Sequence, residues 1–250
     1  MREWKLRGYL TPEDFVGTDT EKLQMALDQA AALDIRKVIV RDVYHVEQPL
    51  IIPDHMHLVL DGGEIHGDLQ NAVSENYSFE RDRIYIQANK GRIVGSITLC
   101  HTRHVVLEDL EIDGEVQLGF CRDSRIEHTR ISGCLTLGRG TANVIVQDLQ
   151  ANAVRVTARK PELDCGREPL IRNIALRRSK INQGVTLLAA EDCGLLNIQV
   201  DQICAAGTAV TIGEPGTQLP AEQYLNLTIS ELDAPEPVCA HNPYKHAFIR

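Results

Sequence analysis

Apolar and polar residues alternate in short runs along most of the chain, and the clearest case is the segment 105–118, VVLEDLEIDGEVQL. Its apolar positions are Val105, Leu107, Leu110, Ile112, Val116 and Leu118. Alternation with period two is typical of strands, whereas a helix needs apolar residues at i, i+3, i+4 and i+7, a spacing that these runs lack. Because polar bends at Glu108-Asp109 and Asp113-Gly114 divide the segment, it predicts three short strands.

The same arrangement returns about every twenty residues. Ile126 follows Leu107 at the same distance in the sequence at which Leu135 follows Val116. Further copies occupy residues 58–69, 86–99, 144–156, 174–187, 196–212 and 225–232, with Leu60 aligned on Leu107 and Leu196 on Ile174. Repeats of this length indicate a solenoid. Strands that stack in parallel on their copies, with the right-handed crossovers that parallel strands nearly always have, predict an all-β, right-handed parallel β-helix.

The two ends of the chain complete the predicted domain. Thr18 or Asp19 can cap a helix that runs to about Leu33, and its apolar face suits the open end of a solenoid. We expect a single domain over residues 1–250. It comprises the capping α-helix and the first strands (1–57), the repeat coils (58–232) and a proline-rich tail (233–250) that covers the last coil.

The order of these segments resembles a known family. A helix, then KVIVRDVYHV (37–46), PLIIPDHMHLVLDGGEIHG (49–67) and coils of the VVLEDLEI type (105–112) are similar to the pectin lyase-like superfamily, which includes pectate lyases, polygalacturonases, epimerases and phage tailspikes. The resemblance implies the right-handed β-helix. The paired aspartates, the Gly-His-Gly and the Arg-Ile-Lys motifs of polygalacturonases have no counterpart at matching positions, so the resemblance implies no catalytic residue.

Composition and charge narrow the range of partners. A net charge of −9 argues against nucleic acid, and no apolar run has the length of a membrane span. The N-terminus lacks the apolar core of a signal peptide, so we expect a cytoplasmic protein; the alternative is a mature secreted or virion-associated form. The seven cysteines are odd in number and follow no metal-binding spacing, which favours reduced thiols used in packing.

Three insertions interrupt the repeat, at residues 71–83, 160–169 and 213–223, and each follows the third strand of a coil. Loops on one side of a solenoid often build its binding surface. The outward residues of the third strands would form the floor beside them: Gln70, Thr98, Gln117, Thr136, Arg155, Thr186 and Thr211. Such a floor suits an extended polyhydroxylated ligand, while solvent-facing strand residues are the alternative interpretation.

Two sets of residues could carry catalysis. Asp68 and Glu115 fall in one column two coils apart, roughly 9.6 Å between backbones, close to the carboxylate separation that glycoside hydrolysis uses. Alternatively, these two are solvated carboxylates at a strand edge. A lyase or epimerase needs a base and a cation near the sugar carboxylate. Arg155, in the floor, is the candidate for the cation.

Other residues would bind the substrate or a metal ion. The substrate-binding candidates are Gln117, Thr136, Arg139, Arg159 and Lys160. Asp164, Glu191 and Asp192 offer oxygen ligands for calcium, although a solvated loop edge has the same composition.

Two functions remain open at this stage. The first is an enzyme, a polysaccharide lyase or glycoside hydrolase acting on uronate-containing glycans. The second is a non-catalytic carbohydrate-binding or structural module of a phage or cell-surface assembly. In both cases the expected partner is an oligo- or polysaccharide, and a homo-oligomer is compatible with the sequence.

Overall fold

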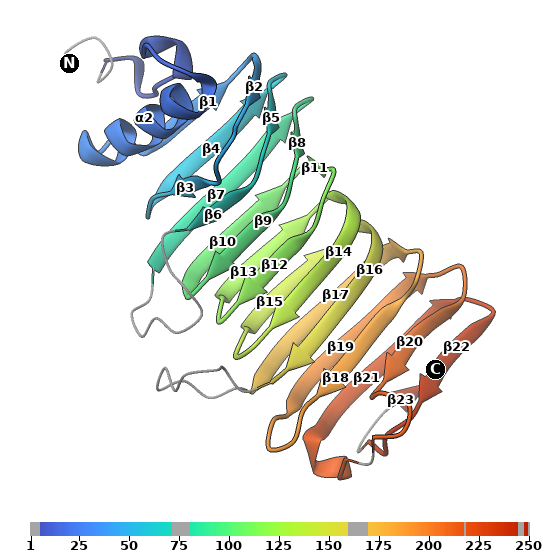
Figure 1. Ribbon diagram of the computed structural model, residues 1–250. Helices are drawn as coiled ribbons and strands as arrows, with labels where there is room; N and C mark the ends of the chain where they lie inside the picture. Colours follow the sequence, from blue (N-terminus) through green and yellow to red (C-terminus); the bar gives the residue numbers. More distant parts are fainter. Residues whose placement is uncertain (1–5, 72–80, 160–169, 218, 245–247, 250) are drawn as a thin grey trace.

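Strands dominate the computed structural model, which describes residues 6–71, 81–159, 170–217, 219–244 and 248–249. The described strands join in one 23-stranded sheet that winds coil upon coil along a rod, with the N-terminal helix at one end (Figure 1). Each coil contributes up to three strands, which stack in parallel on those of the next coil. The molecule is therefore the right-handed parallel β-helix that the sequence predicts.

The strands form three columns along the rod. The first column contains β1 (Lys37–Val40), β4 (Met56–Asp61), β7 (Arg81–Asn89), β10 (Thr102–Glu108), β13 (Arg122–Glu127), β15 (Ala142–Gln147), β17 (Ile171–Ile181), β19 (Leu195–Cys204), β21 (Tyr224–Asp233) and β23 (Phe248–Ile249). The second contains β2 (Val43–His45), β5 (Glu64–His66), β8 (Arg92–Val94), β11 (Glu111–Ile112), the first halves of β14 (Arg130–Gly138) and β16 (Gln150–Ala158), and the last residues of β17, β19 and β21. The third, here called the groove column, contains β3 (Leu50–Ile52), β6 (Leu69–Asn71), β9 (Ile97–Cys100), β12 (Val116–Gly119), the second halves of β14 and β16, β18 (Val185–Ala189), β20 (Thr208–Ile212) and β22 (Glu236–Ala240).

The predicted register is confirmed in the middle of the rod and is wrong near its ends. Leu107 pairs with Ile126, and Val116 with Leu135, as the repeat in the sequence predicts. Upstream, however, Leu58 and not Leu60 stacks on Ile86 in the column of Leu107. The cause is that β4 and β7 are longer than the repeat requires and bury an additional inward residue, so that alternation alone fits two registers.

Downstream the register is shifted in the same way. Ile174 pairs with Ile198, whereas Leu196 pairs with Arg172 on the outside of the rod. Leu225, likewise, pairs with Leu196, and the buried residues beside it in β21 are Tyr224, Leu227 and Ile229. Because the outward face of these last coils also carries apolar residues, the sequence does not show which of the two alternating sets of positions faces the core.

The N-terminal helix α2 (Asp19–Ala32) closes one end of the rod, as predicted. Thr18 is its N-cap, and the side chains of Thr18 and Glu21 form a capping box. Its apolar face, with Leu23 and Leu27 fully buried, packs on the first coil. On its polar side, the Gln24 side chain accepts a hydrogen bond from the backbone N–H of Ile51 and donates one to its carbonyl, so the helix covers the open edge of β3.

The coils extend beyond the limits of 58 and 232 expected from the sequence. Residues 37–52 form a complete first coil, in which β1, β2 and β3 pair with β4, β5 and β6. At the other end, β22 pairs in parallel with β20 and β23 with β21. The segment expected to lie over the last coil as a tail therefore contributes strands to the sheet itself. Within the described residues, two 3₁₀ turns, η1 (Pro12–Asp14) and η2 (Ala221–Gln223), complete the secondary structure.

An asparagine ladder runs along the first column, at one position inside β15, β17, β19 and β21. Asn143, Asn173, Asn197 and Asn226 all adopt left-handed φ values between 54° and 57°. Each side-chain amide nitrogen donates to the carbonyl oxygen of the asparagine one coil earlier, at 2.7 to 2.9 Å, and Asn143 donates to Asp123 at 2.8 Å. The ladder thus joins successive coils on the surface of the rod.

The cysteines contribute to packing. Those that the structure describes are free thiols, and Cys100, Cys121 and Cys193 are buried. Burial raises the pKa of Cys100 to about 11 and that of Cys121 to about 12, so both thiols stay protonated at neutral pH. Cys165 lies outside the described residues. No helix among the described residues is long and apolar enough to cross a membrane.

Candidate functional site: a polar groove along the third strand column

A groove of about 640 Å³ runs across the outer face of the groove column. It extends from β12 to the turn that follows β20. Its lining consists of Gln117, Gly119, Thr136, Gly138, Arg139, Arg155, Thr157, Arg159, Thr186, Leu188, Thr211, Gly213, Glu214 and Pro215. Hydroxyl, amide and guanidinium groups therefore make up most of its functional groups.

The floor of the groove is one row of side chains that stack from coil to coil. Gln117 pairs with Thr136, Thr136 with Arg155, Arg155 with Thr186, and Thr186 with Thr211. They point outward because their neighbours along each strand, such as Val154 and Val156 beside Arg155, fill the core. Gln70 and Thr98 belong to the same row, as predicted, but lie beyond the N-terminal end of the groove.

Three arginines gather in the middle of the groove. Arg155 and Arg159 are exposed and, within the part of the chain that the structure describes, form no ion pair or hydrogen bond through their side chains. Arg139 is 7% exposed and sits in the turn after β14. Its backbone N–H donates to the carbonyl of Thr157 at 3.2 Å, and its own carbonyl accepts the N–H of Phe120 at 2.8 Å. These bonds fix Arg139 between adjacent coils.

Glu214, at the C-terminal end of the groove, is the one carboxylate among the lining residues within the described part of the chain. Its backbone carbonyl accepts hydrogen bonds from the backbone N–H (3.2 Å) and hydroxyl (2.7 Å) of Thr217, which close the turn after β20. Below it, Tyr224 is fully buried, and its hydroxyl accepts the N–H of Ala189 at 3.1 Å. Burial raises the pKa of Tyr224, and the negative charge of Glu214 acts in the same direction, so Tyr224 stays protonated.

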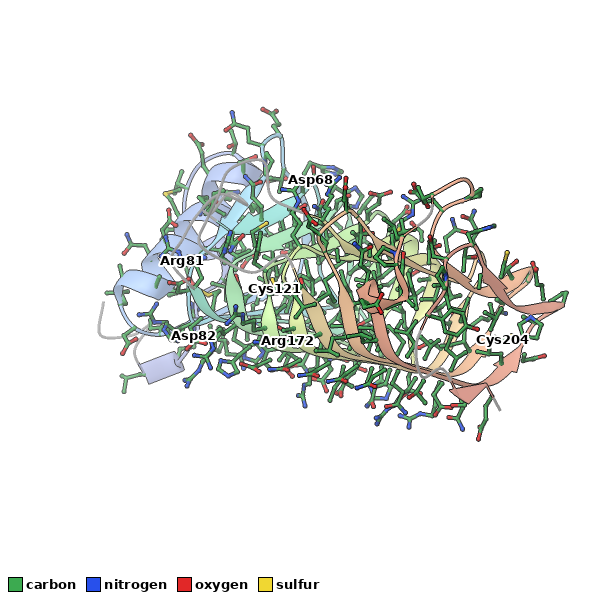
Figure 2. The ribbon with its side chains drawn as sticks, turned by 90° about the horizontal axis from the view of Figure 1, so that it is seen from below. Asp68, Arg81, Asp82, Cys121, Arg172 and Cys204 are labelled. Carbon is green, nitrogen blue, oxygen red and sulfur yellow. The ribbon has the colours of Figure 1, made fainter. Side chains whose placement is uncertain are left out.

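The structure stacks Asp68 and Glu115 in one column, as expected, but outside the groove. The pairing of Leu69 with Ile97 and of Ile97 with Val116 places Asp68, Ser96 and Glu115 one coil apart. Asp68 accepts the backbone N–H of Ser96 at 2.8 Å, and the Ser96 hydroxyl accepts the N–H of Glu115 at 3.2 Å. Figure 2 shows Asp68 on the side of the rod opposite to Arg172. These bonds connect neighbouring coils, which gives Asp68 a structural role.

The residues that the structure describes do not fit a calcium site. Glu191 and Asp192 lie exposed in the turn after β18, outside the groove. No three described His, Cys, Asp or Glu side chains lie close enough together to hold a metal ion. Asp164 and Lys160 lie outside the described residues, together with most of two of the three insertions. The calcium dependence expected from the sequence therefore stays a prediction.

Sequence reasoning missed several lining residues. Gly119 and Gly138 face the groove two positions after Gln117 and Thr136, and their missing side chains deepen it. A Cβ at Gly138 would meet its nearest neighbours, Leu118 O and Thr136 Cγ2, at 3.8 and 4.0 Å, so the strand itself does not require glycine there. The signal was available, because the same alternation that orients Gln117 also orients Gly119. Glu214 and Pro215 lie in an irregular turn, where periodicity predicts no orientation.

The fold and the polar groove define a right-handed parallel β-helix with a groove along one strand column. No protein-family model matches the sequence, and no curated protein matches it either. Among solved structures, PfbA, a surface adhesin of Streptococcus pneumoniae, is similar with a TM-score of 0.59 and 11% identity over 96% of this chain and 93% of that chain. The endo-xylogalacturonan hydrolase from Aspergillus tubingensis is similar with a TM-score of 0.55 and 10% identity over 93% and 88% of the two chains. At such identities the likeness concerns the fold alone.

Proposed function

We propose that this protein is a carbohydrate-active β-helix whose groove binds an acidic, uronate-containing oligo- or polysaccharide. The observation that carries the proposal is the charge of the groove. Among the residues that the structure describes, three arginines and one glutamate line it, in a chain whose net charge is −9. A cationic patch on an otherwise acidic surface attracts anions selectively, because the rest of the molecule repels them.

The chemistry of the lining matches the parts of an acidic sugar. A guanidinium binds a carboxylate through two parallel hydrogen bonds, and Arg155 and Arg159 have their donors available within the described structure. The hydroxyls of Thr136, Thr186 and Thr211 can both donate to and accept from sugar hydroxyls. Since strands repeat at about 4.8 Å, these groups form an evenly spaced row along which an extended chain can lie.

Two activities fit such a groove. Binding without cleavage is one, and PfbA, a β-helix of similar fold, is a surface adhesin. Cleavage is the other, and the second similar structure is a xylogalacturonan hydrolase. A structural role in a phage or cell-surface assembly belongs with the first activity.

Among the cleavage reactions, the lining favours elimination over hydrolysis. Hydrolysis by the usual mechanism needs two carboxylates about 5 to 9.5 Å apart, and among the lining residues that the structure describes Glu214 alone carries one. Elimination needs one base, which takes the proton next to the sugar carboxylate, and a cation that stabilises the charge formed there. The electron pair then forms a carbon–carbon double bond as the glycosidic oxygen leaves and takes up a proton.

A panel of uronate polymers and neutral polymers, measured against the purified protein, tests the proposal. We expect saturable binding to at least one uronate polymer and none to its carboxyl-reduced form. Ultraviolet absorbance of unsaturated products would reveal elimination, and reducing ends without that absorbance would reveal hydrolysis. Equal binding to acidic and neutral forms of every polymer would contradict the proposal.

A further inference from the structure

The charge along the groove changes sign from its middle to its C-terminal end. Arg155 lies in the middle, on β16, with Arg139 and Arg159 beside it. Two strands further along the groove column, Glu214 follows β20. At a strand spacing of about 4.8 Å, the backbones of β16 and β20 lie roughly 9.6 Å apart. On the other side of Arg155 the floor is neutral.

Glu214 lies in a turn that Asn242 holds through hydrogen bonds. Asn242 is 3% exposed, accepts the backbone N–H of Leu219 at 2.9 Å and donates to the Thr217 hydroxyl at 3.4 Å. At the start of the turn, Gly213 has φ +77°, and a Cβ there would lie 1.8 Å from the Asn242 amide nitrogen. The backbone on both sides of Glu214 therefore contacts the residue Asn242, which follows β22.

Resting on the proposed function, we propose that the groove selects a mixed glycan, with an acidic sugar at the arginines and a sugar without a carboxylate beside Glu214. In a polymer made only of uronates, every sugar carries a carboxylate, so one of them must lie near Glu214 whenever another occupies the arginines. Like charges placed together at a binding site reject a ligand strongly. A neutral sugar at that position instead offers hydroxyl donors to the carboxylate.

The residues between the two charged positions are compatible with this arrangement. Thr186 and Leu188 of β18 lie between Arg155 and the turn of Glu214. Leu188 is half-buried and presents an apolar surface in an otherwise polar groove, which suits the C–H face of a sugar ring. Along the groove, Arg155 thus provides a site for a carboxylate, Leu188 an apolar contact and Glu214 an acceptor for sugar hydroxyls.

The test compares three forms of one polymer, so that linkage and backbone stay constant. For polygalacturonate, polyglucuronate and alginate oligosaccharides, one form keeps all carboxylates, one has about half of them reduced to alcohols, and one has all of them reduced. We expect the half-reduced form of the recognised polymer to bind about tenfold or more tightly than the fully acidic form, a difference of roughly 1.4 kcal/mol.

Glu214→Gln should abolish this preference by raising affinity for the fully acidic form about tenfold, with little change for the half-reduced form. The matched control is Glu47→Gln, an exposed glutamate outside the groove, which should change neither affinity. If the fully acidic and half-reduced forms bind the unaltered protein equally well, the inference is wrong while the proposed function stands. If no acidic form of any of the three polymers binds, the proposed function fails, and this inference with it.

Discussion

Arg155 combines an outward-facing position on its strand with the guanidinium that the proposed binding of a carboxylate needs. It is the one charged residue in the stacked row from Gln117 to Thr211. Its neighbours in that row, Thr136 and Thr186, are short and uncharged, so they offer its guanidinium no ion pair. A free guanidinium at the centre of a groove can hold a sugar carboxylate and also neutralise charge that develops on it.

Replacing Arg155 with alanine should therefore separate binding from folding. Because the side chain is exposed, Arg155→Ala should change the free energy of unfolding by no more than about 0.5 kcal/mol. Affinity for the acidic glycan should fall at least tenfold, roughly 1.4 kcal/mol, as measured by calorimetry. Arg172 (labelled in Figure 2) is an exposed arginine of β17 that does not line the groove, so Arg172→Ala should leave affinity unchanged. Unaltered binding by the Arg155 variant would show that the site lies elsewhere.

Gly138 allows a steric test of the same groove. A valine fits the strand, because φ is not left-handed and the added Cβ would meet only ordinary contacts. Its methyl groups would project into the space beside Arg155. We expect Gly138→Val to keep or slightly raise the melting temperature and to weaken glycan binding at least about tenfold. Gly207→Val, at an open position outside the groove, is the matched control. Full affinity in the Gly138 variant would mean that the ligand does not enter the groove.

At the scale of residues, the sequence predicts well which strand side chains face outward, and it predicts poorly where the side chains of loops and turns lie. Gln117, Thr136 and Arg155 line the groove because alternation along a strand determines which side chains face outward. Arg139 and Arg159 also line it, but they follow the ends of β14 and β16. Glu214 has no such periodic signal, and its place depends on Asn242, a residue of the next coil. The catalytic role assigned to Asp68 and Glu115 stays a prediction, and the structure sets both outside the groove.

At the scale of elements, the asparagine ladder joins successive coils at one position of the first column. The four asparagines share a sequence signal, since each immediately precedes a buried apolar residue of its strand: Val144, Ile174, Ile198 and Leu227. Asparagine tolerates the left-handed conformation, and its amide can both donate and accept along the stack. Searching for apolar alternation alone passes over this signal, because the asparagines are exposed.

Substitutions at Asn173 should measure what the ladder contributes. Asn173→Ala removes a hydrogen bond on each side and forces alanine into φ 57°, so we expect a loss of about 1–3 kcal/mol in the free energy of unfolding by urea. Asn173→Gly accepts the same backbone conformation and should lose only the hydrogen-bond part. Equal stability of all three proteins would show that core packing alone joins the coils there.

The elements themselves were the most predictable part of the chain. A helix with a Thr18 cap and strands that recur at a regular period follow from local patterns, and the structure confirms both. The register at the ends of the rod was wrong because outward-facing apolar residues such as Leu196 and Leu225 satisfy the same alternation. The pairing of each strand with the neighbouring coil resolves this ambiguity. That pairing cannot be predicted from the sequence of one segment alone.

At the scale of the whole molecule, the rod needs protection at both ends. Helix α2 covers the first coil, whereas at the other end β22 and β23 extend the sheet. The cytoplasmic location, the homo-oligomer and the calcium dependence stay predictions at this scale. The groove depends on the C-terminal end, because β22 pairs with β20 and the following Asn242 holds the turn of Glu214.

Removing residues 235–250 should consequently damage both the rod and the groove. The deletion takes away β22, leaves β20 as an unpaired edge and uncovers Val210 and Ile212 of the core. Exposed edges and apolar ends of a solenoid promote association, so we expect a lower melting temperature and concentration-dependent oligomers in size-exclusion chromatography. Asn242→Ala in the full chain should leave the rod assembled and affect mainly the Glu214 turn. A shortened chain with the original melting temperature and size would mean that the segment lies over the last coil as a loose tail, as the sequence alone predicted.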